Sequence, residues 1–212
     1  MTQWIDISQP LHADVAAWPG DVPLSQRPTL SIHDGDAVNC SAIRMSTHLG
    51  THADAPYHVD SAGATTSQWA LDVFLGPAEV VAIPPEADAI CPEHIDTTTA
   101  PRLLFKTVSS QHSATRWNET FPAVSAEAVS WMHAHGVCLI GTDAPSVDPA
   151  NSTALTAHHA LNDAQIVNLE NLRLGAVAAG RYTLMALPLR LTGSDAAPVR
   201  AVLHPNPALL AS

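Results

Sequence analysis

The stretch His48-Leu49-Gly50-Thr51-His52-Ala53-Asp54-Ala55-Pro56-Tyr57-His58 places three histidines and one aspartate within eleven residues. A helix is a poor host for it, because Gly50 and Pro56 disfavour helical backbone. A helix would also turn Asp54 about 200° away from His52. In an extended chain the four ionisable side chains share one parity and project from one face. The stretch therefore predicts extended backbone, around which the rest of the fold must be arranged.

A straight strand would still hold the first two histidines too far apart to act together. At about 3.3 Å per residue, His48 and His52 would lie roughly 13 Å apart. Two imidazoles that share a metal ion need their nitrogen atoms within about 3–4 Å. The chain must bend, and the segment 49–51 can supply the bend because Gly50 tolerates the required backbone angles. Asp54 can then reach the same ion or bridge to a second one.

The chemistry of the stretch favours a metal site over the alternative of unrelated polar residues on a loop. One histidine alone would be better explained as an ordinary loop residue. Three histidines and a carboxylate on one parity, beside a glycine bend and a proline, favour metal binding. Two histidines with a carboxylate suit Zn, Mn or Fe.

Outward from this stretch, strand and helix patterns mix without a strict βαβ order. Strands are predicted over residues 4–8, 38–45, 78–83, 102–108, 137–141, 166–170 and 182–191. Helices are predicted over residues 67–74, 125–135 and 152–164, the second of them with Ser125 as N-cap and Gly136 as its stop. We therefore expect a mixed-sheet α/β fold that forms one domain over residues 1–212, since no linker interrupts the chain.

The composition describes a globular, acidic protein. Hydrophobic residues make up 46% of the 212 residues, which favours a folded core over disorder. The net charge of −11 disfavours a nucleic-acid partner. No apolar run approaches the roughly 18 residues of a membrane span. Residues 1–6 lack the basic and apolar regions of a signal peptide, so we expect a cytoplasmic protein.

Several further polar residues need an interpretation of their own. Glu170 lies among apolar residues and needs a partner there, which a cation would provide. We expect Asp143 and Asp148 to be turn residues and not ligands. Cys40, Cys91 and Cys138 are far apart and form no disulfide framework. Surface positions are expected for the histidines His94, His112, His133, His135 and His204.

The central stretch resembles the HxGTHxDxPxH signature of the Putative cyclase family of metal hydrolases. Other motifs of that family occur in matching order, at residues 5–8 (IDIS), 18–21 (WPGD), 141–149 (GTDAPSVDP), 158–161 (HHAL), 169–172 (LENL) and 186–191 (ALPLRL). Within the family, the chain is most similar to the bacterial kynurenine formamidases. The resemblance implies a cyclase-like, swivelling β/β/α fold with a barrel-like sheet core, and a homodimer.

The same resemblance implies a site with two metal ions, which would be Zn, or else Mn, Fe or Co. It implies that His58 is the catalytic acid/base and that Trp18 lines the substrate pocket. A helix would separate the adjacent His158 and His159 by about 100°, so only one can face the metals, and the spacing to Glu170 favours the first. The implied metal ligands are His48, His52 and Asp54 for the first ion, His158 for the second, and Asp54 and Glu170 as bridges.

The implied reaction is hydrolysis of N-formyl-L-kynurenine to L-kynurenine and formate, in tryptophan degradation, by a metal-activated water. No Gly-x-Ser-x-Gly elbow suggests a serine hydrolase instead. One alternative is the same chemistry on another small cyclic or aryl amide, such as isatin. Another is a metal-binding protein without catalysis, which leaves His58 unexplained.

Overall fold

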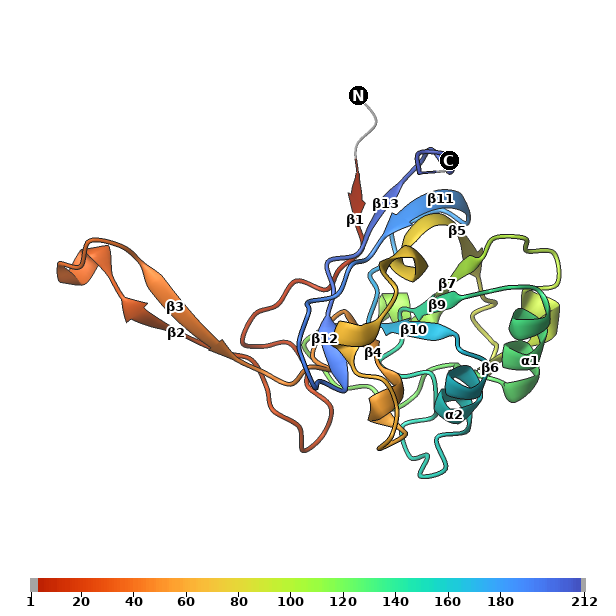
Figure 1. The fold of residues 1–212 in the computed structure, drawn as a ribbon, viewed down its shortest axis with the longest axis horizontal. Coiled ribbons are helices and arrows are strands. Elements are labelled where there is room, and N and C mark those ends of the chain that lie inside the picture. Colours follow the sequence, from red (N-terminus) through yellow and green to blue (C-terminus); the bar gives the residue numbers. More distant parts are fainter. Residues whose placement is uncertain (1–3, 211–212) are drawn as a thin grey trace.

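A curled, mixed sheet of nine strands forms the body of the computed structural model, which describes residues 4–210 (Figure 1). Part of the segment inspected for a signal peptide, residues 1–3, lies outside the described residues. In order across the sheet, the strands are β1 (Ile5–Asp6), β13 (Val202–His204), β11 (Gly180–Met185), β5 (Leu75–Ala82), β7 (Arg102–Lys106), β9 (Leu139–Thr142), β10 (Val167–Glu170), β4 (His52–Asp54) and β12 (Ala196–Pro198). Strands β5, β7, β9 and β10 run parallel, and the outer strands pair antiparallel. The prediction of a mixed α/β sheet is confirmed.

The central strands are buried on both faces. In β7, Leu103 and Phe105 pack with the helices α1 (Ala126–Ala134) and α2 (Thr156–Asp163), whereas Leu104 belongs to the core inside the curl of the sheet. This division follows from the strand period of two, which sends successive side chains to opposite faces. Burial on both faces also explains why the strand reads as a continuous apolar run.

The predicted helices have different outcomes. Helix α1 begins after Ser125, whose side chain accepts a hydrogen bond from the Ala128 N–H, and Gly136 follows with a φ of 73°. The prediction of a helix over 67–74 is wrong, because Trp69 takes extended backbone and packs edge-on against Phe74. Two short 3-10 turns replace it, η3 (Thr66–Gln68) and η4 (Leu71–Phe74). Further 3-10 turns are η1 (Ile32–Asp34), η2 (Pro56–His58), η5 (Pro92–His94) and η6 (Val108–Gln111).

A hairpin arm projects from the body (Figure 1). It consists of β2 (Ser25–Leu30) and β3 (Cys40–Arg44), which pair only with each other within residues 4–210. Only β3 was predicted, because Pro28 argues against a strand and lies where the register of the hairpin shifts. The pair β6 (Ala89–Ile90) and β8 (Ala123–Val124) forms a second small sheet.

One histidine that was expected on the surface lies inside the sheet. His204, which was predicted to lie on the surface, is buried in β13 with its ring against Trp4, so that prediction is wrong. Its position follows from the pairing of β13 with both β1 and β11.

Between residues 4 and 210, no helix has the length and apolar character that crossing a membrane requires.

Candidate metal centre

The register of β4 brings ionisable residues from distant parts of the chain together. Strand β4 lies between β10 and β12, and its buried side chains His52 and Asp54 share one face. In the antiparallel pairing with β10, Glu170 lies opposite His52 and Asn168 lies opposite Asp54. The Asn168 amide donates hydrogen bonds to both carboxylates, at 2.8 Å to Asp54 Oδ2 and 3.3 Å to Glu170 Oε1. The sheet thus fixes two carboxylates and a histidine on one buried surface.

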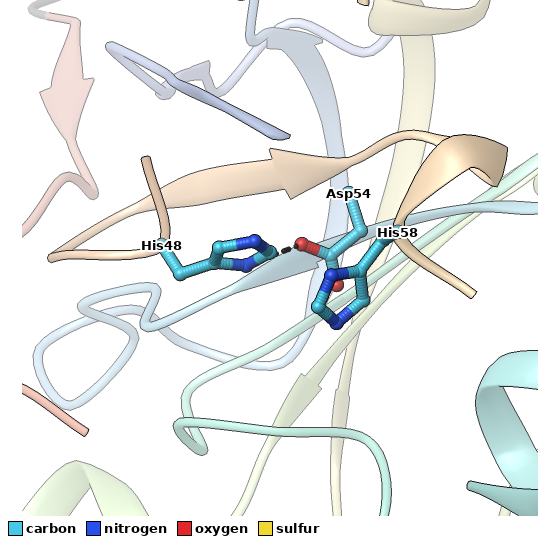
Figure 2. Close-up of side chains that lie close together, drawn as sticks. All are labelled: His48, Asp54 and His58. Atoms are coloured by element: carbon cyan, nitrogen blue, oxygen red, sulfur yellow. Dashed lines mark ion pairs between the residues drawn. The ribbon is translucent and has the colours of Figure 1, made fainter. Parts of the chain in front are cut away.

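The predicted bend before β4 is confirmed. Gly50 has a φ of 69°, a left-handed conformation that glycine adopts without strain. The turn brings His48 back over the strand, so that His48 Nδ1 lies 3.2 Å from His52 Nε2. The same His48 nitrogen lies 3.0 Å from Asp54 Oδ1, the pair that Figure 2 marks with a dashed line.

Helix α2 supplies the remaining histidine of the cluster. His158, in its first turn, is buried and places Nε2 3.4 Å from Asp54 Oδ2 and 3.6 Å from Glu170 Oε1. His159 is exposed. Of the two adjacent histidines, His158 therefore faces the cluster.

The donor atoms have the spacing that metal ions require. His48 Nδ1, His52 Nε2 and Asp54 Oδ1 lie 3.0–3.3 Å from one another. Nitrogen and oxygen donors at about 2.0–2.1 Å from a tetrahedral ion lie about 3.3 Å apart. Asp54 Oδ1 is buried and accepts no hydrogen bond from any described residue, which is costly unless a cation satisfies it. The donor set therefore fits a divalent metal.

The rings of His48, His52 and His158 are each held from the outer side. Asp195 Oδ2 lies 3.1 Å from His48 Nε2, and the Gly50 carbonyl lies 2.9 Å from His52 Nδ1. Asp148 Oδ2 lies 2.6 Å from His158 Nδ1. Such contacts take the N–H of the outer nitrogen and leave the lone pair of the inner nitrogen for a metal.

The two aspartates that were predicted to be turn residues are buried and anchored. The Asp148 carboxylate accepts hydrogen bonds from the Ala157 and His158 N–H groups as well, so it also caps α2. Both aspartates lie in bends of the chain, as turn residues do, and the Asp148 carboxylate is in addition turned toward the helix. Asp143 accepts hydrogen bonds from Thr107 and Ser110 and fixes the loop after β7.

The charges of the cluster attract cations. Burial alone would lower the pKa of His52, but the negative charges of Asp54 and Glu170 raise it to about 10. Burial would also lower the pKa of His158, but hydrogen bonds to Asp148 and Asp54 raise it to about 12. Burial would raise the pKa of Asp54, yet the surrounding histidines hold it well below its usual range. Without a metal, protons on the histidines balance the carboxylates, and a bound cation would replace them.

His58 differs from the other histidines of the cluster. It ends the η2 turn with an exposed side chain, and its ring centre lies 4.3 Å from that of His48 and 5.5 Å from that of His158 (Figure 2). Partial burial, aided by repulsion from those two rings, lowers the pKa of His58. It therefore remains neutral and able to accept a proton at neutral pH.

The cluster opens into a cavity of about 810 Å³. His48, His58 and His158 line it on the cluster side. Trp18, predicted to line a substrate pocket, lies in its wall with 38% of its surface exposed and packs edge-on against Trp117 at a centroid distance of 4.7 Å. Sequence reasoning missed Trp117, Asn168 and Asp195, because no local pattern links them to the histidine stretch.

Comparison with known proteins identifies relatives over nearly the whole chain. Residues 5–149 match the family described as Putative cyclase. A kynurenine formamidase from Salinibacter ruber is 47% identical, over 96% of this chain and 98% of its own length. A structure described as a predicted metal-dependent hydrolase from Bacillus stearothermophilus has a TM-score of 0.81 at 28% identity, covering 96% of this chain and 98% of the other. Isatin hydrolase A from Labrenzia aggregata has a TM-score of 0.82 at 23% identity, covering 96% and 93%.

Proposed function

Because this chain belongs to the Putative cyclase family, we propose that it hydrolyses N-formyl-L-kynurenine to L-kynurenine and formate, a step of tryptophan degradation. The observation that carries the proposal is the 47% identity with the Salinibacter ruber kynurenine formamidase over nearly both full lengths. The chain is accordingly a hydrolase. Isatin hydrolysis is the weaker alternative, because a likeness at 23% identity concerns the fold alone.

We propose two zinc ions as the metals of this site. His48, His52 and Asp54 would hold the first ion, His158 the second, and Asp54 and Glu170 would bridge them. The donor spacing and the unsatisfied Asp54 Oδ1 support this assignment. A set of His and carboxylate donors without thiolate also suits Mn, Fe or Co. Bound divalent ions supply Lewis acidity, which polarises the formyl carbonyl and activates water as the nucleophile.

Two residues of the chain would act on the substrate itself, one by proton transfer and the other by binding the aromatic ring. Neutral His58, on the cavity side of the cluster, would take a proton from the attacking water and deliver it to the departing aryl nitrogen. The amide C–N bond breaks, and the products are formate and the free arylamine. Trp18 in the cavity wall would stack on the aryl ring.

We also propose that the protein is a homodimer, and that the β2–β3 arm contributes to its interface. Leu30, Ile32, Val38 and Ile43 lie in or between the two arm strands with at least 42% of each residue exposed. Apolar side chains gathered on a projecting element favour burial against a partner. A cytoplasmic location remains a prediction.

Formate release from N-formyl-L-kynurenine, measured with and without a chelator, tests the function. We expect chelation to abolish turnover and added zinc to restore it. His58→Ala should keep its metal content and lose about 10²- to 10⁴-fold in kcat. The matched control is His159→Ala, an exposed histidine that should leave both quantities unchanged. Full activity after complete metal removal, or faster turnover of isatin than of the formamide, would contradict the proposal.

A further inference from the structure

Two of the few positively charged side chains of this chain lie at the cavity. The sequence has only nine Lys and Arg residues, and two of them, Arg116 and Arg173, line the cavity that leads to the metal cluster. Both are exposed, so their guanidinium groups are accessible. An acidic protein that keeps two cations at one cavity has a charge arrangement suited to an anionic ligand.

Neither arginine is neutralised by another residue between positions 4 and 210. Among the described residues, Arg116 and Arg173 form no ion pair, whereas Arg181 pairs with Glu79 and Arg200 pairs with Asp6. In the described part of the chain, Arg173 Nη1 donates its one hydrogen bond to the neutral Gln9 side chain, at 3.3 Å. The planar guanidinium fork binds carboxylates through paired, charge-assisted hydrogen bonds. The two groups therefore remain free to bind a carboxylate.

The acidic groups at the same cavity do not cancel this charge. Asp6 is paired with Arg200, and the Asp143 carboxylate is held by hydrogen bonds from Thr107 and Ser110. Glu170 belongs to the metal cluster. Asp21, next to the Trp18 turn, is the remaining carboxylate of the lining and could accept an ammonium group.

Arg116 is adjacent in the sequence to the aromatic wall of the cavity, which consists of Trp18 and Trp117. Arg116 directly precedes Trp117, which packs on Trp18. The same loop region contains Ser109, whose buried hydroxyl lines the cavity and has no hydrogen-bond partner within residues 4–210. The metal cluster, the aromatic wall and the guanidinium groups thus belong to one cavity. Such a cavity suits a ligand that has an amide for the metals, an aryl ring for the tryptophans and a carboxylate for the arginines.

We infer that Arg116 and Arg173 form the carboxylate-binding part of the pocket and select aryl amides whose side chain carries a carboxylate. The inference rests on the proposed function and extends it to specificity. N-formyl-L-kynurenine has its α-carboxylate on the side chain of the aryl ketone, away from the formamide. A neutral lactam such as isatin has no carboxylate to pair with these arginines.

Paired ligands that differ only in the carboxylate test this inference on the metal-loaded protein. L-Kynurenine and its decarboxylated analogue kynuramine are titrated by calorimetry against the unmodified protein, Arg116→Met, Arg173→Met and the double variant. Methionine keeps most of the apolar stem and removes the charge. Arg190→Met is the matched control, since Arg190 is exposed and does not line the cavity.

The double variant should bind L-kynurenine about 10- to 100-fold more weakly, the loss expected for charge-assisted hydrogen bonds. Its affinity for kynuramine should stay the same or increase, because two cations no longer repel the ammonium group. Each single variant should show part of the loss, and Arg190→Met none. An unchanged ratio of the two affinities, or an equal loss for both ligands, would overturn the inference.

Turnover of the two N-formyl ligands separates this inference from the proposed function. If the unmodified protein hydrolyses neither, the proposed function fails, while the calorimetric preference still decides the role of the arginines. If it hydrolyses both and the double variant keeps the preference for the carboxylate form, the inference alone fails.

Discussion

At the scale of single residues, contacts behind the histidines hold the rings that face the cluster. Asp148 binds the outer nitrogen of His158 and also caps α2 through two backbone N–H groups. Its carboxylate therefore fixes both the orientation of the ring and the start of the helix that carries it. A group in this position sets the affinity of a metal site without touching the metal.

We predict that Asp148→Asn lowers the affinity for zinc by about 10- to 100-fold. The amide keeps one accepting oxygen, but it loses the second oxygen and the charge that hold the His158 ring N–H and the helix end. Competition titration with a chromophoric chelator measures the affinity. Asp163→Asn, an exposed position at the end of α2, is the control and should bind zinc normally. Unaltered zinc affinity in Asp148→Asn would show that the contact does not support the site.

Site residues could be predicted from the sequence where they lie close to one another along the chain. His48, His52, Asp54 and His58 are visible because one local stretch carries them on one parity. Asp195 contacts His48 across 147 positions, and the chain offers no local pattern that joins them. Its position follows from β12, a three-residue strand too short to be recognised from alternation.

At the scale of elements, the turn before β4 decides whether the strand can form a metal site. Gly50 holds the left-handed backbone that brings His48 over His52. A Cβ at this position would also lie 2.5 Å from the end of the Leu11 side chain. The exposed Leu11 can move aside, so the backbone conformation accounts for most of the cost of a side chain here.

Gly50→Ala should therefore lower the free energy of unfolding by about 1–2 kcal/mol, the cost of a left-handed non-glycine residue. It should also weaken zinc binding, because relief of the strain shifts His48. Denaturant unfolding and chelator competition measure the two effects. Gly35→Ala is the matched control, since Gly35 has a φ of 98° in the arm with nothing near its Cβ position. If both variants bind zinc equally well, the bend does not position the ligand.

Strands and helices were predictable where burial dictates an unbroken pattern. The central strands β7, β9 and β10 and helix α1 lie within two residues of their predicted bounds, because a continuous core surrounds them. Strands β2, β6, β8, β12 and β13 were missed. Strands β12 and β13 are stabilised by pairing with distant segments. Strand β2 contains Pro28, a residue that disfavours the prediction of a strand. Such strands exist because of the sheet they join and carry little signal of their own.

At the scale of the whole molecule, the arm is the feature that the body does not explain. All six residues of β2 are exposed, and the hairpin adds no strand to the main sheet (Figure 1). An isolated two-stranded hairpin is marginally stable in water. Ile43, at 66% exposure, presents an apolar side chain on β3, where it lies opposite Gln26. A second copy of the chain would bury this surface and stabilise the hairpin.

Ile43→Lys should therefore convert the proposed dimer into a monomer, because a charge would have to be buried in the interface. Light scattering coupled to size exclusion measures the mass. Zinc content should stay normal, since the arm contributes none of the cluster ligands. Ser130→Lys places the same charge on the exposed face of α1, in the body and outside the arm, and should leave the dimer intact. A monomeric unmodified protein, or a dimer that Ile43→Lys does not weaken, would show that the arm serves another purpose.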